Sequence, residues 1–534
     1  MNDVEMISTD EIINEAEISS EEEIITNRNA EVISTIAFLL AVATAIFLRF
    51  YLLEIKPLHH DEGVNSHFLL NLANSGNYKY DPTNYHGPTL YYFSWLTLKL
   101  LGESVFALRF YPAICGVLTV ILMWGLRRGL GLVGTPVAAW SLALSPGLVY
   151  YSRDFIHESS FGFFTVGIIV CAYNLRDSYL WFLPVFAGLL FATKETAIHT
   201  VGVLVAAVIC ALVWDRLRRY LTGDDRESSW FGWVREYRVT WQYWLYFFAV
   251  FVAINILFYS SFFTNWKGVL DAFRSVFMWT GRGFNEHIHD HVFTYYLGIL
   301  VKLELPLLVT AIIGIPITLW RGTKFGLFHM AWTCGMVLGY SRIPYKTPWL
   351  MVSMLIALAV FSGYVAQEIF SLLRMTPLQI AFVVLLVAVA VPTAMMCWQV
   401  NQHKYEDNEN TAGYFAEFGK KRNLTAYTDT QYGYVYAQTD DDLLNLVREV
   451  ERIKPDAIYY STPDYWPLPW YFRDQQISGY GDKLPEQFTG DVLIAADDQR
   501  EEAEQKFQGK YRAQQFTLRP GVNLVLFVKE EKAR

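Results

Sequence analysis

The chain has 534 residues, of which 53% are hydrophobic and 18% are charged, against roughly 25% charged residues in an average soluble domain. Aromatic residues make up 16% and the mean hydropathy is +0.22, which argues against a disordered chain and is typical of a polytopic membrane protein with a sizeable polar part. The net charge of −9 disfavours a nucleic-acid partner. All five cysteines lie in apolar runs without a CxxC pair, so no disulfide framework or cysteine metal site is expected.

Residues 1–30 hold nine acidic residues and a single basic one, Arg28. They begin without an apolar stretch, so they do not resemble a signal peptide. We expect a solvated, disordered acidic tail on the cytoplasmic side. The first membrane span follows at about 31–53 and is long enough to cross the hydrocarbon core as a helix.

Further apolar runs predict about eleven spans in all within residues 31–400. They lie at about 105–126, 131–150, 159–175, 178–193, 197–214, 241–262, 304–320, 325–341, 348–373 and 377–399. With a cytoplasmic N-terminus, the Lys and Arg clusters between these runs all fall on the cytoplasmic side. This agreement requires that 88–101 does not cross, and that short aromatic segment is predicted to lie at the outer interface.

Residues 401–534 have a different pattern and are predicted to form an extracytoplasmic α/β domain. An amphipathic helix at 441–453 alternates with β-rich runs at 457–462, 491–496 and 523–528. The fold class that follows is a polytopic α-helical membrane protein with a C-terminal α/β domain.

The densest group of reactive side chains comes directly after the first span. His60, Asp61 and Glu62 are consecutive, and His86 follows in the same outer loop. Adjacent carboxylates at a membrane exit suit general-base chemistry or cation binding. The alternative is a hydrated loop that carries acidic residues by chance.

Two more charged motifs are placed on the outer side. Arg153, Asp154 and Glu158 lie between the third and fourth spans, where Arg153 would hold Asp154 ionised, or form a loop salt bridge. Lys194 and Glu195 end the short fifth span and must pair or face a cavity. Their alternative role is an ion pair that caps two helices.

Three outer segments supply further candidate ligands. Arg282 and His287 belong to GRGFNEHIHDH, whose histidine spacing lacks one residue of a metal-hydrolase pattern, so a substrate-contacting or structural loop is favoured. Arg342 and Lys346 suit a phosphate, with lipid-headgroup anchoring as the alternative. Trp466 and Trp470 flank stiff prolines and suit an exposed sugar- or peptide-binding surface, with a core loop as the alternative.

Taken in chain order, these motifs resemble the GT-C-type membrane glycosyltransferases, over about residues 31–400. The similarity is greatest to the protein O-mannosyltransferase-like family (glycosyltransferase family 39) and to the bacterial aminoarabinose transferases. The matching pieces are His60-Asp61-Glu62, HGPTLYYFSWLTLKLLGES, Ala107–Pro112, Leu144–Pro146 with Tyr151–Asp154, and Thr193–Thr196. The whole chain, including 465–474, resembles the narrower group of flippase-activity-associated proteins of archaeal and bacterial glycosylation.

The resemblance implies an enzyme that moves a sugar from a polyprenyl-phosphate donor to a protein, lipid or glycan acceptor on the outer face, by inverting hexosyl transfer. It implies Asp61 as general base with Glu62 beside it and Asp154 as the second acid. Basic groups would stabilise the leaving phosphate: Lys346 and Arg342, with Arg282 behind them. No cofactor is certain, although a divalent cation is possible.

Two other functions remain open at this stage. A flippase or transporter component for lipid-linked sugars should carry ionisable groups near mid-membrane, whereas the conspicuous ones here lie at outward ends. A non-catalytic scaffold in glycosylation would tolerate the loss of Asp61.

Overall fold

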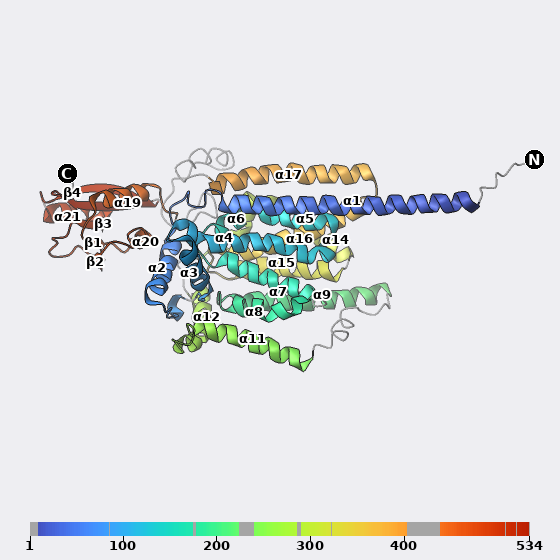
Figure 1. Ribbon diagram of the computed structural model, residues 1–534, viewed down its shortest axis with the longest axis horizontal. Coiled ribbons are helices and arrows are strands. Elements are labelled where there is room, and N and C mark those ends of the chain that lie inside the picture. The colour runs from blue at the N-terminus through green and yellow to red at the C-terminus, as the bar shows by residue number, and fades with distance from the viewer. Residues whose placement is uncertain are drawn as a thin grey trace, which may run out of the picture.

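The computed structural model describes residues 9–84, 86–174, 178–223, 240–285, 290–321, 323–402, 438–507, 509–519 and 521–532. A bundle of long helices forms most of the molecule, and a small α/β domain extends beyond one end of it (Figure 1).

Every apolar run expected to cross the membrane is a helix. These helices are α1 (Thr9–Phe50), α4 (Val105–Leu122), α5 (Arg127–Leu144), α7 (Glu158–Tyr173), α8 (Leu183–Phe191), α9 (Ala197–Thr222), α11 (Trp241–Tyr259), α14 (Leu305–Arg321), α15 (Lys324–Arg342), α16 (Met351–Leu372) and α17 (Thr376–Gln402). Among the described residues, six segments are long and apolar enough to span a membrane, or seven if the bent α13–α14 pair is counted. The protein is therefore a multi-pass membrane protein, but the count of eleven spans is not confirmed.

The bundle is built around α16, which is buried along most of its length. It packs most extensively against α5, where Gly134 and Gly363 face each other. A Cβ atom on Gly134 would lie 2.5 Å from the carbonyl oxygen of Gly363. These two glycines therefore allow the backbones of α5 and α16 to approach closely.

Helix α1 differs from the expectation at its N-terminal end. It begins at Thr9 and runs without a break to Phe50, so helix extends into the acidic segment that was expected to be disordered. Residues 1–8 lie outside the described part.

Shorter helices gather at the end of the bundle that faces the α/β domain, and Figure 1 shows α2, α3 and α12 there. They are α2 (His60–Ser75), η1 (Pro82–Asn84), α3 (Thr89–Leu101), α6 (Pro146–Ser152), α12 (Lys267–Asn285), α13 (Tyr295–Leu303) and η4 (Pro348–Leu350). Helix α13 is bent by 110° against α14. The segment expected to lie at the interface, 88–101, is α3.

The α/β domain contains a five-stranded sheet in the order β2-β1-β3-β5-β4. The strands are β1 (Ile458–Ser461), β2 (Ile477–Gly481), β3 (Val492–Ala496), β4 (Tyr511–Arg519) and β5 (Val522–Lys529). Strand β1 is parallel to β2 and β3, whereas β5 is antiparallel to β3 and β4. The helices are α19 (Asp442–Ile453), α20 (Leu468–Tyr471), η5 (Asp497–Gln499) and α21 (Arg500–Lys506).

The expected helix and three expected strands of this domain are confirmed as α19, β1, β3 and β5. Leu443, Leu446, Val447 and Val450 of α19 recur at helical spacing and are buried in the domain core. Strands β2 and β4 were not predicted. The first contains two glycines in five residues, and the second is largely polar and exposed on alternate residues, so neither is an apolar run.

Candidate functional site

The first outer loop positions Asp61 in the first turn of α2. His59 is the N-cap residue: its Nδ1 accepts a hydrogen bond from the Asp61 backbone N–H (3.1 Å), while Glu62 Oε2 accepts one from the His59 N–H (2.8 Å). This capping box starts the helix at His60. Both carboxylates lie at the helix N-terminus, where the helix dipole favours negative charge.

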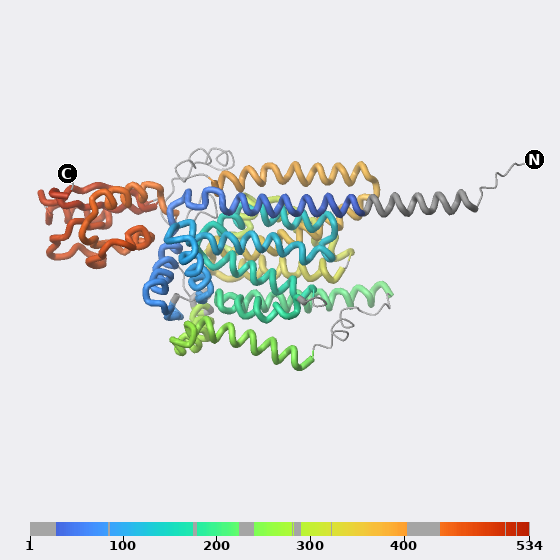
Figure 2. Tube along the Cα trace, in the orientation of Figure 1, coloured from blue at the N-terminus to red at the C-terminus, as the bar shows by residue number. Residues whose placement is uncertain are grey.

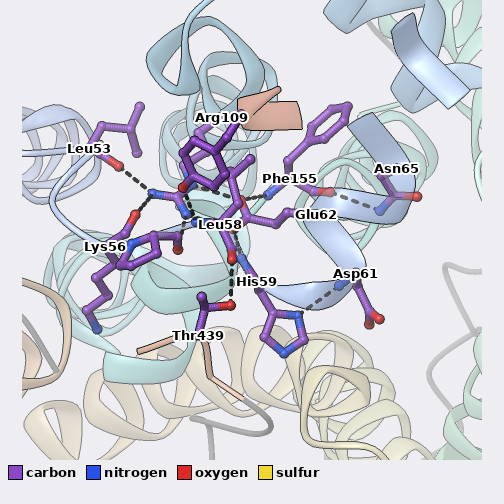
Figure 3. Close-up of polar contacts among 12 residues, drawn as sticks. Leu53, Lys56, Leu58, His59, Asp61, Glu62, Asn65, Arg109, Phe155 and Thr439 are labelled. Carbon is purple, nitrogen blue, oxygen red and sulfur yellow. Dashed lines mark hydrogen bonds and ion pairs between the residues drawn. The ribbon is translucent and has the colours of Figure 1, made fainter. Parts of the chain in front are cut away.

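Glu62 is fully buried and fully engaged (Figure 3). Its Oε1 accepts hydrogen bonds from Arg109 Nε (2.8 Å) and the Phe155 N–H (2.7 Å). Its Oε2 accepts from Arg109 Nη2 (2.7 Å) and the His59 N–H. A carboxylate offers about four acceptor positions, so Glu62 has none left for a substrate. We therefore assign Glu62 a structural role next to Asp61, without direct contact with the reacting atoms.

Asp61 is the opposite case. It is half-buried, and its carboxylate points away from the Glu62–Arg109 pair (Figure 3). Within the described residues that carboxylate accepts no hydrogen bond. The neighbouring His60 has its pKa lowered by burial, and the charges of Asp61, Arg519 and Asp464 act on it too. Arg519 and Asp464 belong to the α/β domain, so charges of that domain act on His60.

Arg153 has a structural position, and its proposed contact with substrate stays a prediction. Its guanidinium donates hydrogen bonds to the carbonyl oxygens of Leu48, Arg49, Tyr51 and Leu52 at the end of α1. Arg109 does the same for the carbonyl oxygens of Leu53, Lys56 and Pro57. Arg153 thus satisfies free carbonyl groups where α1 ends, and Arg109 satisfies those of the segment between α1 and α2.

Asp154 lies in a small pocket with Lys56, Tyr150 and Asn401. Burial, with a smaller effect from Glu62, raises the pKa of Asp154 to about 8, despite the nearby cations. Burial also lowers the pKa of Lys56 to about 7. Arg153 lowers the pKa of Asp154, as expected, but burial has the larger effect.

A second polar cluster joins the ends of α7 and α8 to the first outer loop. Lys194 Nζ and Glu158 Oε1 form a buried ion pair 2.5 Å apart, as in the structural alternative for this motif. His86 Nδ1 lies 3.2 Å from Glu195 Oε2. The other oxygen of Glu195, Oε1, is buried and has no hydrogen-bond partner in the described structure.

Hydrogen bonds connect this cluster to α2. Asn65 Nδ2 donates to the Phe155 carbonyl oxygen and Tyr91 Oη donates to Asn65 Oδ1, both at 3.0 Å. His157 Nε2 lies 3.1 Å from the Gly87 carbonyl oxygen, and its ring is 4.8 Å from that of His86. The motifs at 59–62, 86–87, 153–158 and 194–195 therefore come together, as their order along the chain suggested.

In the segment expected to bind phosphate, the donors of Lys346 are engaged by backbone carbonyl groups. Lys346 is buried, and its ammonium group donates to the carbonyl oxygens of His291 (2.9 Å) and Ile343 (2.6 Å). It therefore holds two outer segments together. Arg342, at the end of α15, is exposed and remains a candidate. Arg282 is in α12 with only its backbone described, and His287 lies outside the described residues.

The two tryptophans differ. Trp470 is 2% exposed and packs in a core cluster with Leu58 and Tyr91 of the outer loop, so its prediction as an exposed binding residue is wrong. Trp466 is half-buried, and its ring lies 5.7 Å from that of His67 on α2.

The sequence interpretation missed the roles of Arg109, Asn65 and Gly63. Arg109 was noted only as part of a family motif, because nothing local links it to Glu62, 47 residues away. Asn65 carries a local signal, since it lies one helical turn after Glu62.

No group of three or more His, Cys, Asp or Glu side chains suited to a metal ion occurs in the described part of the chain.

Comparisons with known proteins agree with this arrangement. Residues 85–224 match the family model described as dolichyl-phosphate-mannose-protein mannosyltransferase. No curated protein matches the chain.

Three solved structures share the fold. ArnT from Cupriavidus metallidurans bound to undecaprenyl phosphate is 14% identical, covers 93% of this chain and 98% of its own, and has a TM-score of 0.61. Its apo state gives 13% identity, the same coverage and a TM-score of 0.57. The Archaeoglobus fulgidus oligosaccharyltransferase tethered with an acceptor peptide is 12% identical, covers 94% of this chain and 76% of its own, and has a TM-score of 0.53. The resemblance to GT-C-type membrane glycosyltransferases is thus confirmed at the level of the fold, with the mannosyltransferase family pattern in residues 85–224.

Proposed function

We propose that the protein transfers a sugar from a polyprenyl-phosphate donor to an acceptor hydroxyl on the outer face of the membrane. The observation that carries this proposal is the contrast between Asp61 and Glu62. Asp61 presents a free carboxylate, and the next residue fixes the helix that carries it. The shared fold supports the donor class, because one of the similar structures is ArnT bound to undecaprenyl phosphate.

In this reaction Asp61 is the general base. It accepts the proton of the acceptor hydroxyl while that oxygen forms a bond to the anomeric carbon. The bond between the anomeric carbon and the phosphate oxygen breaks, and the polyprenyl phosphate leaves as an anion. Attack opposite the leaving group inverts the anomeric centre.

The leaving phosphate needs positive charge or hydrogen-bond donors near it. Lys194 and Lys346 are already engaged, with Glu158 and with backbone carbonyl groups. Half-exposed His86, held by Glu195, and exposed Arg342 are the candidates that remain. Asp154 lies with Lys56, so we assign it a role in shaping the loop rather than in proton transfer.

A transfer assay with the purified protein tests the proposal, using polyprenyl phosphates that carry different hexoses. Sugar transfer that depends on Asp61 is the expected result. Product formation at the wild-type rate by the Asp61→Asn variant would reject the assignment as an enzyme and would favour a flippase component or a scaffold. The same assay identifies the sugar.

A further inference from the structure

Beside Asp61, aromatic side chains continue from α2 onto the α/β domain. The ring of His67 on α2 lies 5.7 Å from Trp466, Trp466 lies 5.1 Å from Tyr465, and Tyr465 lies 5.2 Å from Tyr480 on β2. We call His67, Trp466, Tyr465 and Tyr480 the aromatic strip. Behind it, the ring of buried Tyr460 stacks on Tyr480 at 5.2 Å, which fixes the outermost ring.

The strip is accessible along its length. His67 is exposed, Trp466 and Tyr465 are half-buried, and Tyr480 is 53% exposed. Strand β2 is an edge strand of the sheet, and Ser478 is exposed on the same face as Tyr480 because side chains alternate along a strand. The aromatic surface therefore has polar neighbours.

The strip is also tied to the candidate site. A Cβ atom on Gly63, two residues after Asp61, would lie 2.7 Å from Pro467 Cα and 3.3 Å from Trp466 Cε3. His67 is six residues beyond Asp61, which is about 9 Å along the axis of α2 and about 120° around it, so the strip lies on the neighbouring face of the helix. A molecule with its reactive hydroxyl at Asp61 and two or three ring units can reach the strip.

The chemistry of the strip favours a carbohydrate over an apolar partner. Tyr480 is the only exposed large hydrophobic side chain in the described part of the α/β domain, so the domain lacks the large apolar patch that marks a protein interface. The domain also projects past the end of the helix bundle, away from the lipid-facing helices (Figure 1). Tyr and Trp present a flat apolar face with a polar edge, which suits sugar rings. Exposed polar groups such as Asn71, 3.0 Å from His67 Nε2, suit their hydroxyls.

We propose that the aromatic strip binds the carbohydrate portion of the acceptor. The inference rests on the proposed function and narrows its acceptor to a glycan or a glycan-bearing molecule. Tyr480 is the outermost contact, and Trp466 is the contact nearest α2.

Binding of saccharides to the full-length purified protein, without any donor, tests the inference. The probes are trisaccharides of mannose, glucose, galactose and N-acetylglucosamine, plus an unglycosylated peptide. The test variant is Tyr480→Ala, whose exposed side chain can be removed without opening the core. The matched control is Tyr220→Ala, an 85% exposed tyrosine near the end of α9.

We expect at least one trisaccharide to bind, and Tyr480→Ala to weaken that binding about tenfold or more, as the loss of one stacked ring would. Tyr220→Ala should bind like the wild type, because its side chain lies near the end of α9 and is not part of the strip. The inference is overturned if no trisaccharide binds, if Tyr480→Ala binds unchanged, or if only the peptide shows dependence on Tyr480. A failure in this binding test does not affect the transfer assay, in which sugar transfer can still depend on Asp61. Conversely, transfer that persists in Asp61→Asn rejects the proposed function and is seen without any binding measurement.

Discussion

Asp61 and Glu62 are adjacent and chemically alike, yet the structure gives them different tasks. The first turn of α2 directs Glu62 into the bundle, where Arg109 and two backbone N–H groups neutralise and hold it. Asp61 faces outward and keeps its acceptor positions free. The sequence indicated that this pair matters, but not which member is free, because that depends on Arg109 and Phe155, both distant along the chain.

Asp61→Asn should abolish measurable sugar transfer, because the acceptor proton loses its base. The loss of a general base typically lowers the rate by about 10²–10⁴-fold. Expression and the unfolding temperature should stay normal, since the Asp61 side chain makes no hydrogen bond with any described residue. Asp81→Asn is the control, because Asp81 is an outer-loop carboxylate whose hydrogen bonds, as far as the described residues go, are those with nearby Thr83. Equal loss of transfer in both variants would contradict the role of Asp61.

Glu62→Gln should destabilise the protein as well as inactivate it. Removing one partner of a buried ion pair leaves the other charge uncompensated and costs about 3–5 kcal/mol, and Arg109 is 3% exposed. Thermal unfolding in detergent measures this effect. A normal unfolding temperature for Glu62→Gln would contradict the structural role.

The environment of Asp154 predicts a pH effect on stability. Its pKa is raised from 3.8 to about 8 by burial, so the folded state binds this proton more tightly than the unfolded chain does. Asp154 therefore stabilises the fold at low pH, and that contribution is lost as the pH rises from about 4 to about 8.

Asp154→Asn cannot lose a proton and should remove this part of the pH dependence. The unfolding temperature of the wild type should fall more between about pH 5 and about pH 8 than that of the variant. Parallel pH profiles for the two proteins would show that Asp154 is ionised in the folded state.

At the scale of elements, apolar runs and amphipathic spacing were sufficient to locate the helices of the bundle, α19 and three strands. They did not locate β2 or β4, whose residues are held in the sheet by pairing rather than by their own hydrophobicity. Nor did they show that Trp470 is buried, because the surface that covers it belongs to the first outer loop, about 400 residues earlier. Contacts between distant segments are the part that composition and periodicity do not contain.

The contact of α2 with the α/β domain illustrates such a long-range constraint. The backbone N–H of Leu58 donates to Tyr471 Oη (2.9 Å), Thr439 Oγ1 donates to the Leu58 carbonyl oxygen (2.7 Å), and Pro467 rests on Gly63. The domain therefore contacts the chain both before and after Asp61, at Leu58 just ahead of α2 and at Gly63 in its first turn.

Gly63→Ala should lower the transfer rate without unfolding the bundle. The added methyl group would lie 2.7 Å from Pro467 Cα, a backbone atom that cannot rotate away, so α2 and the domain must separate. Misplacing a reacting group by about 1 Å can cost about 10²-fold in rate. Gly298→Ala is the control, because its Cβ would meet nothing within 4 Å. Equal rates for the two variants would show that this contact does not position Asp61.

At the scale of the whole molecule, the N-terminal side of the described part of α1 and the α/β domain lie at opposite ends of the helix bundle (Figure 2). The α/β domain shares its end with α2 and the candidate site, whereas α1 extends from the other end. Which of these two ends lies outside the cytoplasm follows from the charges of the segments between the helices. The Lys and Arg distribution in the sequence supplies that direction and favours a cytoplasmic N-terminus.

We therefore predict that the α/β domain and Asp61 are extracytoplasmic. A reporter that is active only outside the cytoplasm, fused after Lys529, should be active, and the same reporter at the N-terminus should be silent. Activity at the N-terminus alone would reverse the topology and place Asp61 on the cytoplasmic side. Equal activity of both fusions would place both fusion points on the same side of the membrane. That result would contradict a bundle in which α1 and the α/β domain extend from opposite ends. A prenyl-phosphate sugar presented at the outer leaflet can meet Asp61 only if the first of these results is observed.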